Sequence, residues 1–145
     1  MMRFFICVVL MLAFILGAIW LEGGRFPAFF APTTFAVVLL VPFISTFAVW
    51  GFPGIGKAFR SALGKVEDAK VLGRSLIVWD FFEKTTYAAG LLGFILGIIL
   101  VLTSITEPRT IGKPLSFCFL SLIYGFFFGI VARILRARVE ENSAG

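Results

Sequence analysis

Seven polar side chains lie in or beside the last two apolar stretches of the sequence, where an ion or proton path would need them. They are Thr85, Thr86, Thr103, Ser104, Ser116, Ser121 and Tyr124. Ser and Thr in membrane helices more often hydrogen-bond to their own backbone carbonyls than line such a path. A proton path also needs an ionisable group within the membrane, and these stretches contain none. Any carboxylate relay is therefore predicted to take its carboxylate from a partner chain.

Other residue types that could do chemistry are few. Asp80 and Glu83 border the third apolar stretch, and we predict that both are solvated at the membrane interface. The chain has no His, and Cys7 and Cys118 fall inside apolar stretches, where Cys packs as a small hydrophobe. The GIGK segment at residues 54–57 lacks the spacing of a phosphate-binding loop. We expect no enzymatic activity, no cofactor and no metal.

Two rows of small residues recur at intervals of four. The first row is Ala89, Gly93 and Gly97, and the second is Ser121, Gly125 and Gly129. Such rows let helix backbones approach closely in a membrane, where lipid offers no hydrophobic drive between helices. Two interpretations stand side by side: the rows pack against each other within one chain, or one row packs between subunits.

The elements that must carry these residues are membrane helices. Sixty per cent of the 145 residues are hydrophobic, 14% are charged and the mean hydropathy is +1.05. Four uncharged stretches cover residues 4–21, 35–52, 87–104 and 115–132. About 18–20 helical residues cross a bilayer core, so the sequence predicts an all-α membrane protein with four transmembrane helices. We interpret the first stretch as a retained span rather than a signal peptide, and expect Pro42 to kink the second.

Between the second and third stretches, residues 54–84 alternate apolar and charged side chains at helical spacing. This pattern predicts an amphipathic helix at the cytoplasmic interface, weakened by Gly64 and Gly73, with Trp79 as an interfacial anchor. After the fourth stretch, residues 133–145 form a short basic tail. The whole chain, 1–145, is predicted to form one membrane domain.

Basic residues fix the expected orientation. With four spans, ten Lys and Arg fall on one side of the membrane and three on the other. The richer side is expected in the cytoplasm, together with both chain ends. The net charge of +5 is thereby assigned to topology and anionic lipid, and no nucleic-acid partner is expected.

Several segments in order resemble the MotA/TolQ/ExbB family of inner-membrane motor subunits, and the flagellar stator in particular. They are EGGRFPAFFAPTTF with Gly23, Gly24, Ala28 and Pro32, then GKAFRSAL, then GLLGFILGIILVL with Gly90, Gly93 and Gly97, and finally EPRTIGKPLSFCFLSLIYGFFFGI with Pro108, Gly112, Tyr124 and Gly125. Together they cover roughly two thirds of the chain. The large cytoplasmic insertion of the stator is cut here to about thirty residues.

The resemblance implies a bacterial inner-membrane ring, expected to be a pentamer of identical chains. Such a ring would surround the helices of a single-span partner resembling MotB, TolR or ExbD and would couple an ion gradient to mechanical work. The candidate pore-lining residues are Phe94 and Leu122, which align with pore-side positions of the family, and Thr86, Ser121 and Tyr124, the nearest polar groups on this chain. The family has small or hydroxyl groups where this chain has Phe94 and Leu122, so we predict that the chain alone does not conduct protons.

Two other functions remain open from the sequence. One is a non-conducting scaffold or assembly subunit of a membrane complex. The other is an unrelated four-helix transporter subunit or lipid-handling protein. A single-span partner with a membrane Asp would favour the motor subunit over both.

Overall fold

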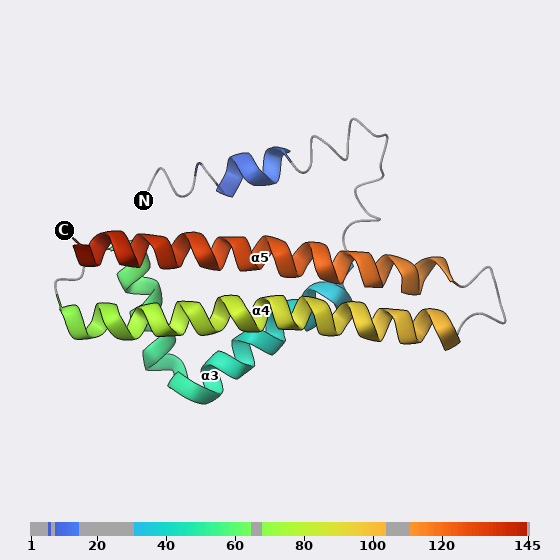
Figure 1. The fold of residues 1–145 in the computed structure, drawn as a ribbon, viewed down its shortest axis with the longest axis horizontal. Coiled ribbons are helices and arrows are strands. Elements are labelled where there is room, and N and C mark those ends of the chain that lie inside the picture. Colours follow the sequence, from blue (N-terminus) through green and yellow to red (C-terminus); the bar gives the residue numbers. More distant parts are fainter. Residues whose placement is uncertain (1–5, 7, 15–30, 65–67, 104–110, 145) are drawn as a thin grey trace.

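The computed structural model describes residues 6, 8–14, 31–64, 68–103 and 111–144, and every regular element in these ranges is an α-helix (Figure 1). Three long helices dominate: α3 (Pro32–Leu63), α4 (Ala69–Thr103) and α5 (Gly112–Ala144). Each is long and apolar enough to cross a membrane. The first predicted span lies largely outside the described residues, although residues 8–14 are helical.

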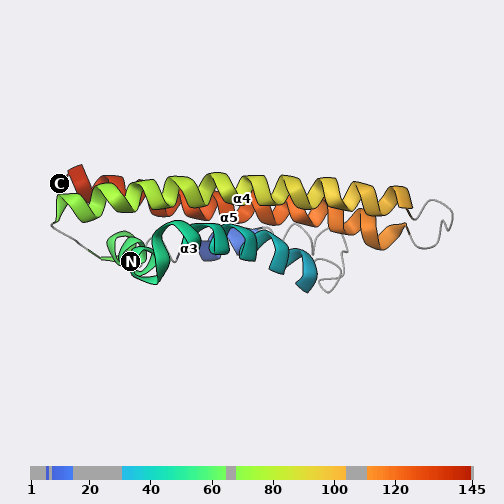
Figure 2. The same cartoon turned by 90° about the horizontal axis from the view of Figure 1, so that it is seen from below.

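Helices α4 and α5 form an antiparallel hairpin that is longer than a bilayer core is thick (Figures 1 and 2). Their 35 and 33 residues correspond to about 50 Å of helix, against a hydrocarbon core of about 30 Å. The predicted third and fourth spans occupy only the apolar part of this hairpin. The remainder carries the charged side chains from Lys70 to Lys84 in α4 and from Arg133 to Glu141 in α5. The hairpin is therefore one continuous rod with an apolar part and a charged part.

Helix α3 consists of two parts that meet at Gly51, nine residues beyond Pro42, where a kink was predicted. Gly51 has φ 65° and ψ 179°, the only non-helical conformation inside α3, whereas Pro42 remains helical. Only glycine adopts this backbone region at low cost. Pro53 follows within the first turn of the second part, where a missing N–H breaks no hydrogen bond. The bend thus uses Gly51 to change direction and Pro53 to begin the next helix.

The predicted amphipathic helix over residues 54–84 is not a separate element. Residues up to Leu63 form the second part of α3, and residues from Ala69 onwards are the first half of α4. The second part of α3 lies crosswise over the charged part of the hairpin, and Figure 2 views it nearly end-on. Helix α3 ends at Gly64, where the backbone becomes extended. The low helix propensity of glycine agrees with this helix end.

Burial differs between the two parts of the molecule. The core cluster lies where the second part of α3 crosses the hairpin, and consists of Ala58, Ala62, Leu72, Val78, Trp79, Ala132, Leu135 and Val139. In contrast, the most apolar windows of α3, α4 and α5 are only 17%, 28% and 33% buried. Large apolar side chains exposed at this density mark a surface covered by lipid or by other chains. The molecule therefore has a protein core beside the charges and a lipid-facing surface elsewhere.

Trp79 belongs to that core and not to the membrane interface, so its predicted anchoring role is wrong. Its side chain is almost fully buried, at 3% exposure. The indole Nε1–H donates to the carbonyl oxygen of Ala58 across a distance of 3.1 Å. Phe59 lies edge-on to the indole ring, with 4.9 Å between ring centroids. Trp79 thereby joins the second part of α3 to α4.

Candidate functional site

Glycine residues form a close backbone contact between α4 and α5. A Cβ atom placed on Gly90 would lie 2.9 Å from the Cα of Gly125 and 3.0 Å from the carbonyl oxygen of Ser121. A Cβ on Gly125 would lie 2.8 Å from the Cα of Gly90. These neighbours are backbone atoms, which cannot move aside as a side chain can. The two helices can touch at this depth only because both positions are glycine.

The same contact continues along both helices, and we call it the glycine seam: Gly90, Gly93 and Gly97 of α4 with Cys118, Ser121, Gly125 and Gly129 of α5. Gly93 faces the side chain of Ser121, Gly97 faces Cys118, and Gly129 faces the ring of Tyr87. The seam therefore pairs the two predicted rows within one chain. Ala89 of the first row is buried at 1% exposure, but the backbone contact with Gly125 is made by its neighbour Gly90.

The buried hydroxyl groups at the seam hydrogen-bond to their own helices. Thr86 and Ser121 are both 0% exposed. Thr86 Oγ1 donates to the Phe82 carbonyl, and Ser121 Oγ donates to the Cys118 carbonyl, each at 2.7 Å. Back-bonding also accounts for Thr85, Ser116 and Thr103. These five hydroxyl groups therefore hydrogen-bond to carbonyl oxygens of their own helices, which was expected from the sequence as the alternative to lining an ion path.

The remaining predicted pore-lining residues lie in other surroundings. Tyr124 is half-buried and packs edge-to-face against Phe35 of α3, with ring centroids 5.9 Å apart. Phe94 and Leu122 are half-buried. The single chain therefore does not gather the five residues along one surface, because Thr86 and Ser121 are enclosed in the seam while Tyr124 contacts α3.

At its charged end the seam is followed by a cluster of ion pairs. Glu83 is 5% exposed, and its Oε1 lies 3.1 Å from Arg133 Nε. Arg136 pairs with Asp80 and lies 3.2 Å from Glu140, while Lys84 Nζ lies 2.7 Å from Asp80 Oδ2. We call these six residues the ion-pair cluster. Burying a carboxylate requires such partners, since an unpaired buried charge is very costly.

The predicted solvated role of Glu83 is therefore wrong, whereas Asp80 is partly exposed as well as paired. The sequence contains a signal for this arrangement. Asp80 and Glu83 are three residues apart on α4, and Arg133 and Arg136 are three residues apart on α5. Residues at this spacing lie on one face of a helix, so an antiparallel hairpin brings the two acids against the two bases.

Comparison of the chain with family models, with curated proteins and with solved structures gives no match. The seam and the ion-pair cluster are consequently interpreted from their own geometry. Together they lock α4 and α5 into one unit that extends from the apolar part to the charged part.

Proposed function

We propose that this chain is a non-enzymatic, MotA/TolQ/ExbB-like subunit of a homo-oligomeric ring in the bacterial inner membrane. The ring, proposed as a pentamer, encloses the transmembrane helix or helices of a MotB/TolR/ExbD-like partner and couples an ion gradient to mechanical work. The observation that carries this proposal is the locked α4–α5 hairpin. It joins a lipid-facing part to a protein core beside the charges without a break in either helix.

The hairpin suits mechanical coupling because it can transmit a displacement along its length. Two helices of about 50 Å that are joined at the glycine seam and at the ion-pair cluster do not slide past each other easily. The core cluster attaches the crosswise part of α3 to the same rod. A movement imposed within the membrane would therefore reach the charged end as a movement of one body.

A second function, the non-conducting scaffold, is favoured by the state of the hydroxyl groups. Thr86 and Ser121 already donate to backbone carbonyls and are closed off in the seam. The apolar part of α4 and α5 also contains no Asp, Glu, Lys or Arg. Conduction in the proposed ring would then depend on an Asp supplied by the partner. A scaffold would have no such partner Asp and would not conduct.

Proton flux into proteoliposomes that contain a pH-sensitive dye separates these two functions. With this protein alone, the proposal expects no flux above that of empty vesicles. Co-reconstitution with the single-span partner should give flux that disappears when the membrane Asp of the partner is changed to Asn. Rapid flux with this protein alone contradicts the proposal, and an absence of flux with the partner present favours the scaffold.

A further inference from the structure

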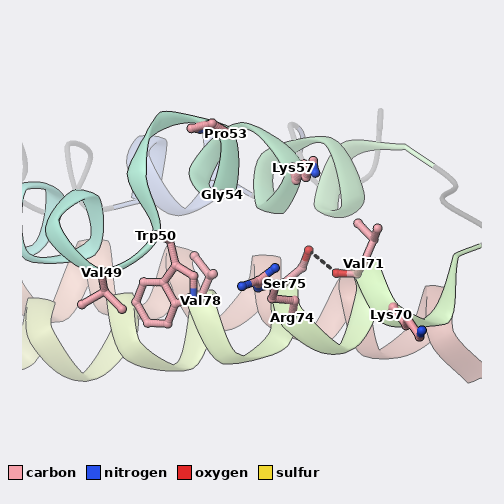
Figure 3. Close-up of a pocket in the computed structure, with 10 residues that line it drawn as sticks. All are labelled: Val49, Trp50, Pro53, Gly54, Lys57, Lys70, Val71, Arg74, Ser75 and Val78. Carbon is pink, nitrogen blue, oxygen red and sulfur yellow. Dashed lines mark hydrogen bonds between the residues drawn. The ribbon is translucent and has the colours of Figure 1, made fainter.

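A pocket of about 280 Å³ lies between α3 and α4 beside the bend at Gly51. Figure 3 shows its two walls, with Trp50, Pro53 and Lys57 on the side of α3 and Lys70, Arg74 and Val78 on the side of α4. The bend creates this space because α3 turns away from α4 there and then crosses over it. The glycine seam and the ion-pair cluster do not contribute to the pocket.

Three of the ten lining residues are basic and none is acidic. Lys57, Lys70 and Arg74 are exposed, and the described part of the chain gives none of them an ion pair. The nearby carboxylate of Asp68 accepts a hydrogen bond from the backbone N–H of Lys70. In the ion-pair cluster, by contrast, Lys84, Arg133 and Arg136 each have a carboxylate partner. The pocket thus holds a concentration of positive charge that its own walls do not neutralise.

The pocket opens beside surface that belongs in lipid. Val49, a lining residue, is 60% exposed, and Phe52, which directly precedes the lining residue Pro53, is 73% exposed. On the α4 side, Ile77 is 60% exposed beside the lining residue Val78. Side chains of this kind are stable when covered by acyl chains, and Trp favours the headgroup level of a bilayer. The α3 wall of the pocket, with Val49 and Trp50, therefore lies at the end of the second apolar stretch, where acyl chains meet headgroups, and the α4 wall lies in the charged part of the hairpin.

We propose that Lys57 and Arg74, with Lys70 at the outer edge of the pocket, form a binding site for a phosphate group (Figure 3). The source of this phosphate is the headgroup of an anionic phospholipid in the adjacent leaflet. Lys and Arg bind phosphate oxygens through charge-assisted hydrogen bonds. The apolar wall of Val49, Trp50 and Pro53 accommodates the glycerol and the first acyl carbons. A bound lipid would join α3 to α4 across the bend. This lipid site goes beyond the proposed motor function, which does not require a bound lipid.

Native mass spectrometry of the full chain in a neutral detergent tests this site. The protein is titrated with phosphatidylglycerol and, separately, with phosphatidylcholine of the same acyl chains. The test variants are K57Q and R74Q, singly and together, and the matched control is R60Q. Arg60 is an exposed cation on the same helical part as Lys57 but does not line the pocket. All four variants change exposed side chains, and circular dichroism verifies that each retains its helix content.

We expect phosphatidylglycerol to bind more tightly than phosphatidylcholine, and each pocket substitution to weaken it about fivefold, since one basic residue near an anionic surface contributes about 1 kcal/mol. R60Q should retain the wild-type affinity. Inorganic phosphate and glycerophosphoglycerol, added in excess, distinguish the source of the ligand. Failure of both to displace the lipid supports the lipid headgroup. Displacement by millimolar inorganic phosphate overturns the lipid as the source and assigns the pocket to free phosphate. Equal binding of the two lipids, or equal losses in R60Q and K57Q, overturns the site.

Discussion

Gly90 and Gly125 allow the backbones of α4 and α5 to meet in the hairpin. We expect G90A to lower the free energy of unfolding by about 1–3 kcal/mol, the usual effect of overpacking a close contact. The new methyl group would meet the backbone of Gly125 and Ser121 at 2.9–3.0 Å, so the helices would have to separate. Thermal or denaturant unfolding in a mild detergent measures the change.

Gly73 provides the matched control on the same helix. A Cβ atom there would have no neighbour within 4 Å, and alanine is the better helix former by about 1 kcal/mol. G73A should therefore be as stable as the wild type or more stable. If G90A gained as much stability as G73A, close packing at the seam would be refuted.

The pair formed by Glu83 and Arg133 is the second feature at the scale of residues. A double-mutant cycle with E83Q and R133Q should give a coupling energy of about 1 kcal/mol, because the carboxylate is buried but the arginine side chain is largely exposed to screening. The more exposed pair of Lys84 and Asp80 should give a smaller coupling in the same assay. A coupling of zero for Glu83 with Arg133 would contradict the assigned contact.

Single residues were predictable from the sequence where spacing alone determines the contact. Gly93, Gly97 and Gly125 were recognised by their intervals of four, and the backbone bonding of Thr86 and Ser121 follows from the chemistry of a hydroxyl group in a helix. The sequence could not show that Gly90 meets Gly125, because this depends on the register of the two helices. The spacing of Asp80 and Glu83 and of Arg133 and Arg136 does predict that acids face bases, but the burial of Glu83 again depends on the register of the two helices.

The bend in α3 is the most informative feature at the scale of elements. We expect G51A to destabilise the protein by about 1–3 kcal/mol, since a side chain at φ 65° is strained. The control is G56A, on the helical part that follows, where a Cβ atom meets nothing within 4 Å. Unfolding experiments on both variants measure the difference. Equal stability of G51A and G56A would show that the bend at Gly51 is incorrectly assigned.

The apolar elements were predictable because lipid selects for long uncharged helices, and the three described helices agree with the second, third and fourth predicted spans. The division of the intervening segment between two helices was not predictable from its sequence pattern. Residues 54–84 have one continuous amphipathic pattern, but Gly64 ends a helix within it and the rest continues into α4. Whether such a segment lies on the membrane or packs on the hairpin depends on tertiary contacts, here those of Ala58 and Ala62 with Trp79 and Leu135.

For the whole molecule, the distribution of basic residues predicts how the chain lies in the membrane. Single Cys substitutions at Arg25 and Arg109 should react with an impermeant thiol reagent added outside the cell. Substitutions at Lys65 and Arg138 should react only after the membrane is permeabilised. The expectation follows from the ten-to-three division of Lys and Arg. The reverse pattern of labelling would contradict both the orientation and the resemblance to motor subunits.

Assembly is the central claim at this scale, because a chain that acts as a ring subunit must meet copies of itself. The exposed apolar side chains of α4, among them Leu91, Leu92 and Ile95, leave ample surface for lipid or neighbouring subunits, while the glycine seam is already filled from within the chain.

Native mass spectrometry of the protein, released from lipid nanodiscs or a mild detergent, tests this claim most directly. We predict a mass of five chains, each of 16.0 kDa, with or without bound lipid. A clean monomer, obtained across several mild detergents and in nanodiscs, would contradict the ring.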